Sequence, residues 1–131
     1  MTPRELVLAY IDALEALNFP VARSFLADQG FEYFGPNMHF TSADEMLTFL
    51  FGMGPIQKAI DTRRVVTEGD EVCVLLDYKT YFEPIGDVRV AIWAKVVGDR
   101  IQKLEVFYNA AVVENMLSVD GSNPFIPQQK K

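Results

Sequence analysis

The sequence predicts one α+β domain in which helices pack on one face of a curved sheet. Helix signals fill the first half of the chain, and strands joined by tight turns fill the second half. Helices followed by a run of strands are typical of the α+β class. A length of 131 residues with 50% apolar residues fits a single globular domain. We expect this domain to span residues 1–117, followed by a loosely ordered C-terminal tail at 118–131.

Capping signals mark three helices in the first half. Residues Thr2–Glu5 form a capping box with proline at the first helical position, and Asn18 can cap a second, short helix. Residues Ser42–Glu45 form another capping box, and Gly54-Pro55 end the helix that it opens. The segment 31–40 between the second and third helices is aromatic and extended.

The second half predicts four strands, over about 57–67, 71–82, 88–97 and 100–109. Because opposed residues of antiparallel strands share a face, the lengths of the three turns fix which side chains point together. A two-residue turn at Gly98-Asp99, a four-residue loop at Pro84–Asp87 and an even-length turn at Gly69-Asp70 give two sets. The first contains Arg63, Val65, Val74, Leu76, Tyr78, Thr80, Ala91, Trp93, Leu104, Val106 and Tyr108. The second contains Cys73, Leu75, Asp77, Lys79, Tyr81, Val90, Ile92, Ala94, Glu105, Phe107 and Asn109.

The two predicted faces differ in character. The first is largely apolar and aromatic, so it suits packing against the amphipathic helices. The second mixes charges with apolar side chains and is too apolar to be fully exposed to water, which indicates a partner surface. We expect a symmetric homodimer through Tyr81, Val90, Ile92 and Phe107.

Charge and composition exclude several classes of function. The net charge of −6 disfavours nucleic acid and anionic membranes, which require clustered Lys and Arg. One Cys and one His do not make a typical His/Cys metal site, and no phosphate-binding glycine loop is present, so we expect no metal and no cofactor. The N-terminal segment has acids within its apolar stretch, and no apolar run reaches about 20 residues, so we expect a cytoplasmic protein.

The segments AYIDALEALNF, FLAD, FGP, TSADEM and VAIWAKVVGDRIQKLEVFYNA resemble the nuclear transport factor 2-like superfamily, in particular its SnoaL-like branch, over roughly residues 4–117. The resemblance implies a cone-shaped barrel: a strongly curved mixed or antiparallel sheet, covered by about three N-terminal helices, that encloses a pocket. It also implies dimers through the convex face of the sheet. Ketosteroid isomerase, polyketide cyclases and limonene epoxide hydrolase belong to this superfamily.

Most catalytic residues of these enzymes have no counterpart in this chain. Tyr10 matches the oxyanion-holding tyrosine of ketosteroid isomerase, but Phe34 and Ala91 stand where that enzyme has its two aspartates. The Asp-Arg-Asp set of the epoxide hydrolase falls on Tyr78, Leu76 and Val106. Neither activity is therefore expected.

Three residues remain candidates for catalysis. The phenol of Tyr10 could stabilise an enolate, and Glu32 or His39 could move a proton. The alternatives are that Tyr10 packs in the core and that Glu32 and His39 lie at the surface.

The candidates for ligand binding are the aromatic and apolar residues that the register and the resemblance place at the pocket. An aromatic wall with polar tips suits a flat or cyclic apolar ligand, although the same side chains could simply fill the core. Arg63 could hold a ligand carboxylate, or it could pair with a protein carboxylate. The full set is Tyr10, Phe34, Arg63, Leu76, Tyr78, Trp93, Val106 and Tyr108.

These observations favour a protein that binds a small apolar or cyclic molecule in an aromatic-lined pocket without a catalytic set. The first alternative is a cofactor-independent isomerase, cyclase or dehydratase that uses enolate chemistry on a polyketide- or steroid-like substrate. The second is a dimeric scaffold whose cone is filled by its own side chains. A binding protein requires a cavity of at least ~300 Å³, and an enzyme requires Glu32 or His39 at that cavity.

Overall fold

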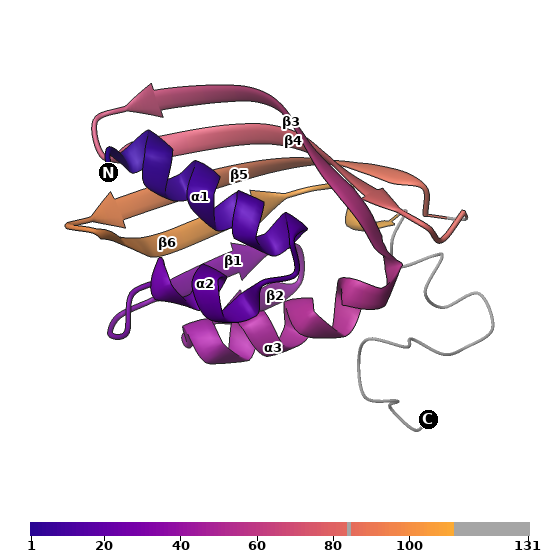
Figure 1. Ribbon diagram of the computed structural model, residues 1–131, viewed down its shortest axis with the longest axis horizontal. Coiled ribbons are helices and arrows are strands. Elements are labelled where there is room, and N and C mark those ends of the chain that lie inside the picture. The colour runs from indigo at the N-terminus through magenta and orange to yellow at the C-terminus, as the bar shows by residue number, and fades with distance from the viewer. Residues whose placement is uncertain (84, 112–131) are drawn as a thin grey trace.

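The computed structural model describes residues 1–83 and 85–111, so the expectation of a loose tail at 118–131 lies outside the described residues (Figure 1). Three helices come first, α1 (Pro3–Glu15), α2 (Phe19–Ser24) and α3 (Ala43–Met53), with a short 3₁₀ turn, η1 (Gly54–Ile56), after α3. The strands are β1 (Glu32–Gly35), β2 (Met38–Phe40), β3 (Gln57–Glu68), β4 (Glu71–Thr80), β5 (Asp87–Val97) and β6 (Arg100–Phe107). None of the described helices is long and apolar enough to cross a membrane.

The strands form one six-stranded sheet in the order β2-β1-β6-β5-β4-β3. All neighbours are antiparallel except β1 and β6, which are parallel, so the sheet is mixed. Figure 1 shows the sheet curving around α1; α3 contacts β1 and β2, and α2 packs against α1 and α3. The α+β class, the curved mixed sheet and the helical cover are confirmed, but β2 and β3 remain edges, so the sheet does not close into a barrel.

The predicted caps start all three helices. The hydroxyl of Thr2 accepts the Glu5 N–H at 3.1 Å, and the Glu5 carboxylate accepts the Thr2 N–H at 2.8 Å. Asn18 caps α2 through the Val21 N–H, and Ser42 caps α3 through the Glu45 N–H. Each cap satisfies an N–H group that has no partner within its own helix.

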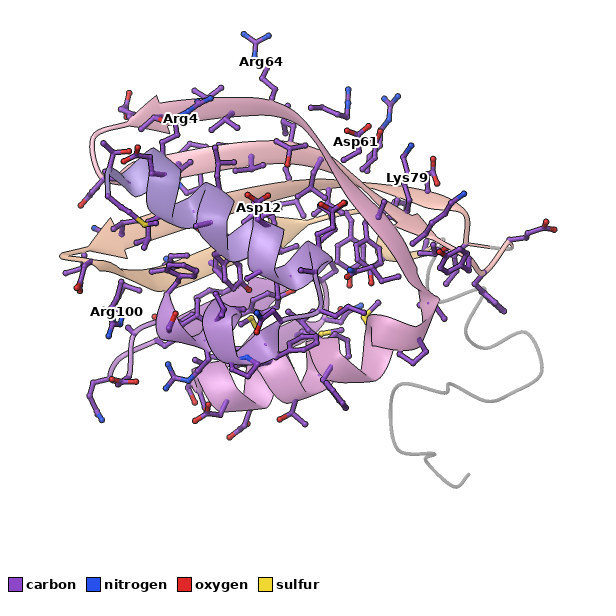
Figure 2. All side chains as sticks on the ribbon, in the orientation of Figure 1. Arg4, Asp12, Asp61, Arg64, Lys79 and Arg100 are labelled. Carbon is purple, nitrogen blue, oxygen red and sulfur yellow. The ribbon has the colours of Figure 1, made fainter. Side chains whose placement is uncertain are left out.

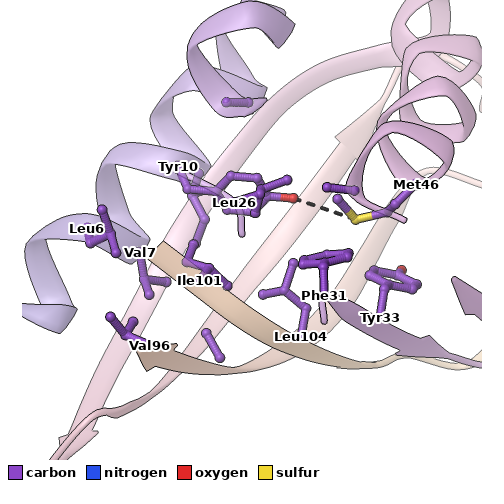
Figure 3. Close-up of a cluster of buried hydrophobic side chains, with 14 of the residues drawn as sticks. Leu6, Val7, Tyr10, Leu26, Phe31, Tyr33, Met46, Val96, Ile101 and Leu104 are labelled. Carbon is purple, nitrogen blue, oxygen red and sulfur yellow. Dashed lines mark hydrogen bonds between the residues drawn. The ribbon is translucent and has the colours of Figure 1, made fainter. Parts of the chain in front are cut away.

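The packed core lies under the N-terminal half of α1. Figure 3 shows Leu6, Val7 and Tyr10 of this helix above side chains from the sheet and from the segment before β1. The largest fully buried side chains are Tyr10, Phe31, Leu26, Met46, Ile101, Leu104, Val7, Val72 and Val74. Toward the C-terminal end of α1, a cavity lies between the helix and the sheet.

The face predicted for β5 is wrong. The chain turns after Thr80 rather than after Glu83, because the Thr80 N–H donates to the Gly86 carbonyl at 3.2 Å. Tyr78 therefore pairs with Val88 rather than with Trp93, a shift by an odd number of residues that turns β5 over. Ala91 and Trp93 lie on the outer face, and the strand presents its other side to the helices: Val88, Val90, Ile92 and Ala94.

A bulge between β5 and β6 compensates for this shift. The register changes between Lys95 and Val96, so Ile92 pairs with Val106 and Ala94 with Leu104. Leu104 and Val106 therefore point toward the helices, as predicted.

Candidate functional site: a cavity between the helices and the sheet

A cavity of about 140 Å³ lies between the C-terminal half of α1, the α3–η1 segment and the inner face of the sheet. The cavity therefore does not reach the ~300 Å³ that the sequence-based prediction required of a binding protein, and its volume limits any ligand to a smaller molecule. Most of its wall is apolar: Ile11, Leu14, Phe19, Phe49, Leu50, Met53, Ile56, Ile60, Leu76, Ile85, Val88, Val90, Ile92, Leu104 and Val106. Its polar lining consists of Tyr10, Tyr33, Tyr78, Tyr108, Gln57 and Thr80.

No Asp, Glu, His, Lys or Arg is among the described residues that line the cavity. The charged side chains lie elsewhere, and Figure 2 shows Arg64 projecting away from the molecule. An ionised ligand group would find no countercharge in this wall, and burying an unpaired charge is costly. The described wall therefore suits an electrically neutral molecule.

The four tyrosines give the cavity its hydroxyl groups. Burial raises the pKa of Tyr10 and of Tyr33 well above 10, and burial raises the pKa of Tyr78 to about 12. The phenol of Tyr108 raises the pKa of Tyr33 further, and the phenol of Tyr33 does the same to Tyr10. At neutral pH such phenols keep their protons and can donate hydrogen bonds, but they cannot act as bases.

Tyr10 is fully buried, and its hydroxyl donates to the Met46 sulfur at 3.9 Å (Figure 3). A thioether is a weak acceptor, so this contact holds the ring in place only loosely through its hydroxyl. Tyr10 is thus both a core side chain and part of the cavity wall.

Gln57 and Thr80 face each other across the β3–β4 pair. The side-chain nitrogen of Gln57 donates to the carbonyls of Leu14 and Glu15 at 3.1 and 3.0 Å, which fastens the end of α1 to β3. The hydroxyl of Thr80 lies 2.7 Å from the Gly86 carbonyl, to which it donates. Both residues line the cavity with their donor groups directed at protein carbonyls.

Five of the eight side chains predicted to bind a ligand line the cavity: Tyr10, Leu76, Tyr78, Val106 and Tyr108. Trp93 does not, because the register of β5 places it on the outer face, where its indole N–H donates to Glu71. Val90 and Ile92, predicted to form the dimer surface, line the cavity for the same reason.

Phe34 and Arg63 also lie away from the cavity wall. Phe34 stacks on the His39 ring with centroids 4.4 Å apart and has the Lys103 ammonium over its face. Arg63 sits at a register shift between Thr62 and Arg64, and its guanidinium lies 3.7 Å from the Asp77 carboxylate. Neither residue is among the described residues that line this cavity.

Glu32 and His39 lie outside the described cavity wall. Their side chains are 45% and 48% exposed, and the Glu32 carboxylate lies 3.4 Å from His39 Nε2. Alternation along β1 explains the position of Glu32, because Tyr33 between Glu32 and Phe34 is the residue that points inward.

Tyr33 and Gln57 line the cavity but were not predicted from the sequence as site residues. Tyr33 faces inward because β1 pairs in parallel with β6, with Tyr33 opposite Leu104. The two strands are far apart in the chain, so no turn sequence between them predicts this pairing. Gln57 begins β3, where its position depends on the end of α1. Among the described residues, no three His, Cys, Asp or Glu side chains come together as a metal site would require.

The fold and this wall define a class: an open α+β cone with an apolar cavity under its first helix. No family model and no curated protein sequence matches the chain. Solved structures do match. A nuclear transport factor 2-like protein of unknown function from Cytophaga hutchinsonii shares 23% identity and a TM-score of 0.76, over 87% of this chain and 96% of that one.

Two further structures carry activities in their names. A candidate SnoaL-like polyketide cyclase from Jannaschia sp. is 17% identical, with a TM-score of 0.71 over 88% of this chain and 91% of its own. An epoxide hydrolase from M. tuberculosis is 15% identical, with a TM-score of 0.72 over 90% and 94%. At these identities the likeness shows the fold alone: this chain has the nuclear transport factor 2-like fold.

Proposed function

We propose that the protein binds a small, neutral, largely apolar molecule of about one ring in the cavity under α1. The observation that carries this proposal is the wall itself, an apolar lining with four phenols, one amide and one hydroxyl, and no ionised group among the described residues. Apolar walls with few polar groups are typical of small-molecule sites. An engineered apolar cavity of about 150 Å³ binds benzene, so about 140 Å³ is enough for a single ring.

The described residues argue against the enzymatic alternative. Enolate chemistry needs a base within hydrogen-bond reach of the substrate. Glu32 and His39 pair with each other outside the wall, and the phenols of the cavity have pKa values raised by burial. An enzyme built on this wall would therefore have donors for an oxyanion but no group to take up the proton.

The cavity also argues against the scaffold alternative. A cone filled by its own side chains has few voids larger than a water molecule. An opening of about 140 Å³ lined by apolar groups exceeds that limit several-fold.

A direct test is to titrate the protein with benzene and with methylcyclohexane. The NMR signals of the methyl groups in the cavity wall report on binding. Both should shift the signals of Leu76 and Leu104, which line the cavity. The variant Val106→Phe, which places a ring in the cavity, should abolish these shifts. The matched control Val66→Phe alters a valine that is 52% exposed and outside the cavity wall, so it should leave binding intact. If neither hydrocarbon binds the wild-type protein, the proposal is wrong.

A further inference from the structure

The polar groups at the β3–β4 end of the cavity differ in what they offer a ligand. An amide nitrogen has two protons, and both of those on Gln57 are used by the carbonyls of Leu14 and Glu15. Carbonyls only accept hydrogen bonds, which fixes the orientation of this amide. The Gln57 oxygen therefore points away from the end of α1, and no described residue donates a hydrogen bond to it.

Thr80, which pairs with Gln57 across the strands, also has its side-chain proton used by protein carbonyls. A hydroxyl has one proton, and that of Thr80 is directed at the carbonyls of Gly86 and Phe82, at 2.7 and 3.2 Å. The lone pairs of its oxygen remain. These two paired residues of the cavity wall thus keep side-chain acceptors, whereas their side-chain protons are already used by protein carbonyls.

Tyr78 supplies the complementary group. It lies two residues before Thr80 on β4 and lines the same cavity, because alternate residues of a strand share a face. Its hydroxyl has no recorded hydrogen-bond partner in the described part of the chain. A ligand group that both donates and accepts would therefore match this end of the wall better than a group that only accepts.

We propose that the ligand of this cavity is a neutral alcohol, whose hydroxyl donates to the Gln57–Thr80 acceptor pair and can accept from Tyr78. This inference rests on the proposed binding function and adds a ligand class to it. An alkylammonium group could also donate, but no described carboxylate lines the wall to balance its charge. A ketone of the same size cannot donate, so it would leave the two acceptors unpaired.

The test compares three molecules of one size on the wild-type protein: cyclohexanol, cyclohexanone and methylcyclohexane. Cyclohexanol should bind more tightly than cyclohexanone, by roughly threefold to tenfold, which is the net value of one hydrogen bond. Should cyclohexanone bind as tightly as cyclohexanol, the alcohol inference is wrong while the binding function stands. If none of the three binds, the binding function itself fails.

A variant of Thr80 tests whether this residue causes the preference for cyclohexanol over cyclohexanone. Thr80→Val keeps the shape of the side chain and removes one acceptor, so the ratio of the two affinities should fall toward one. Thr62→Val makes the same change at an exposed residue of β3 outside the cavity wall and should leave the ratio unchanged. An unchanged ratio in a folded Thr80→Val protein would overturn the role of Thr80. If that variant does not fold, the wild-type comparison still decides the ligand class.

Discussion

At the scale of single residues, Tyr10 tests whether a buried hydroxyl contributes to stability. The ring is fully buried, but within the described part of the chain its hydroxyl donates to the Met46 sulfur, a weak acceptor. Tyr10→Phe should change the free energy of unfolding by less than about 1 kcal/mol. Tyr10→Ala removes the ring and should cost about 3–5 kcal/mol. Urea denaturation measures both; a loss above about 2 kcal/mol in Tyr10→Phe would indicate a stronger partner than sulfur.

The phenol of Tyr78 makes a prediction about alkaline pH. The unfolded chain releases this proton near the ordinary pKa of 10.0, whereas burial raises the pKa of folded Tyr78 to about 12. Below pH 10 the stabilisation is fully present, and between pH 10 and 12 the unfolded state binds fewer protons, so stability falls as pH rises. Denaturation of the wild type and of Tyr78→Phe across this range should show a shallower fall in the variant. If the stability of the two proteins fell equally with pH, Tyr78 would not have a raised pKa in the folded state.

At the scale of elements, the sequence predicted the helices better than the registers of the strands. Thr2, Asn18 and Ser42 cap their helices as expected, because a cap is a contact between residues three apart in the chain. Which face of β5 points inward depends on where the loop before it begins. The loop was predicted to follow Glu83 but follows Thr80, and Trp93 therefore lies on the outer face of the sheet. The sequence does not fix the exact length of a loop, and a change of one residue in the pairing register reverses which side chains of a strand face inward.

The same distinction explains which site residues were found. Leu76 and Tyr78 lie on β4, the strand that follows the short Gly69-Asp70 turn, whose even length was predicted correctly. Tyr33 was missed because its direction depends on a parallel pairing with a strand about seventy residues away. Arg63 was misplaced because a shift in the β3–β4 register cannot be read from residue types.

The end of α1 carries a prediction about backbone strain. Leu17, two residues beyond the helix, has a φ of 57°, the left-handed conformation that glycine adopts most easily. Leu17→Gly should raise the free energy of unfolding by about 0.5–1 kcal/mol. Ala16, with a φ of −76°, is the matched control, and Ala16→Gly should lower stability by roughly 0.5–1 kcal/mol. Chemical denaturation of both variants distinguishes relief of strain from a general effect of glycine.

At the scale of the whole molecule, the two faces of the sheet have different environments. The inner face lies against the helices and the cavity, whereas several outer-face side chains of β5 and β6 are exposed in the described chain. Trp93 and Phe107 lie there, 43% and 57% exposed. Charges of both signs surround them, with Arg63 and Arg89 near the Asp77 carboxylate at 3.7 and 4.0 Å. A face with both signs of charge can pair with a copy of itself.

We propose that a second copy of the chain covers this outer face, with Phe107 near the centre of the interface. Phe107→Glu would place a carboxylate against the partner's apolar surface and should convert a dimer into a monomer. Analytical ultracentrifugation measures the mass, and the emission of Trp93, the only tryptophan, should shift to longer wavelength as the face becomes exposed to water. Phe51→Glu changes a phenylalanine that is 67% exposed on α3, on the helical side, and should leave the dimer intact. A wild-type protein that stays monomeric at high micromolar concentration would contradict the proposal, and the outer face would then need another partner to account for its exposed aromatic side chains.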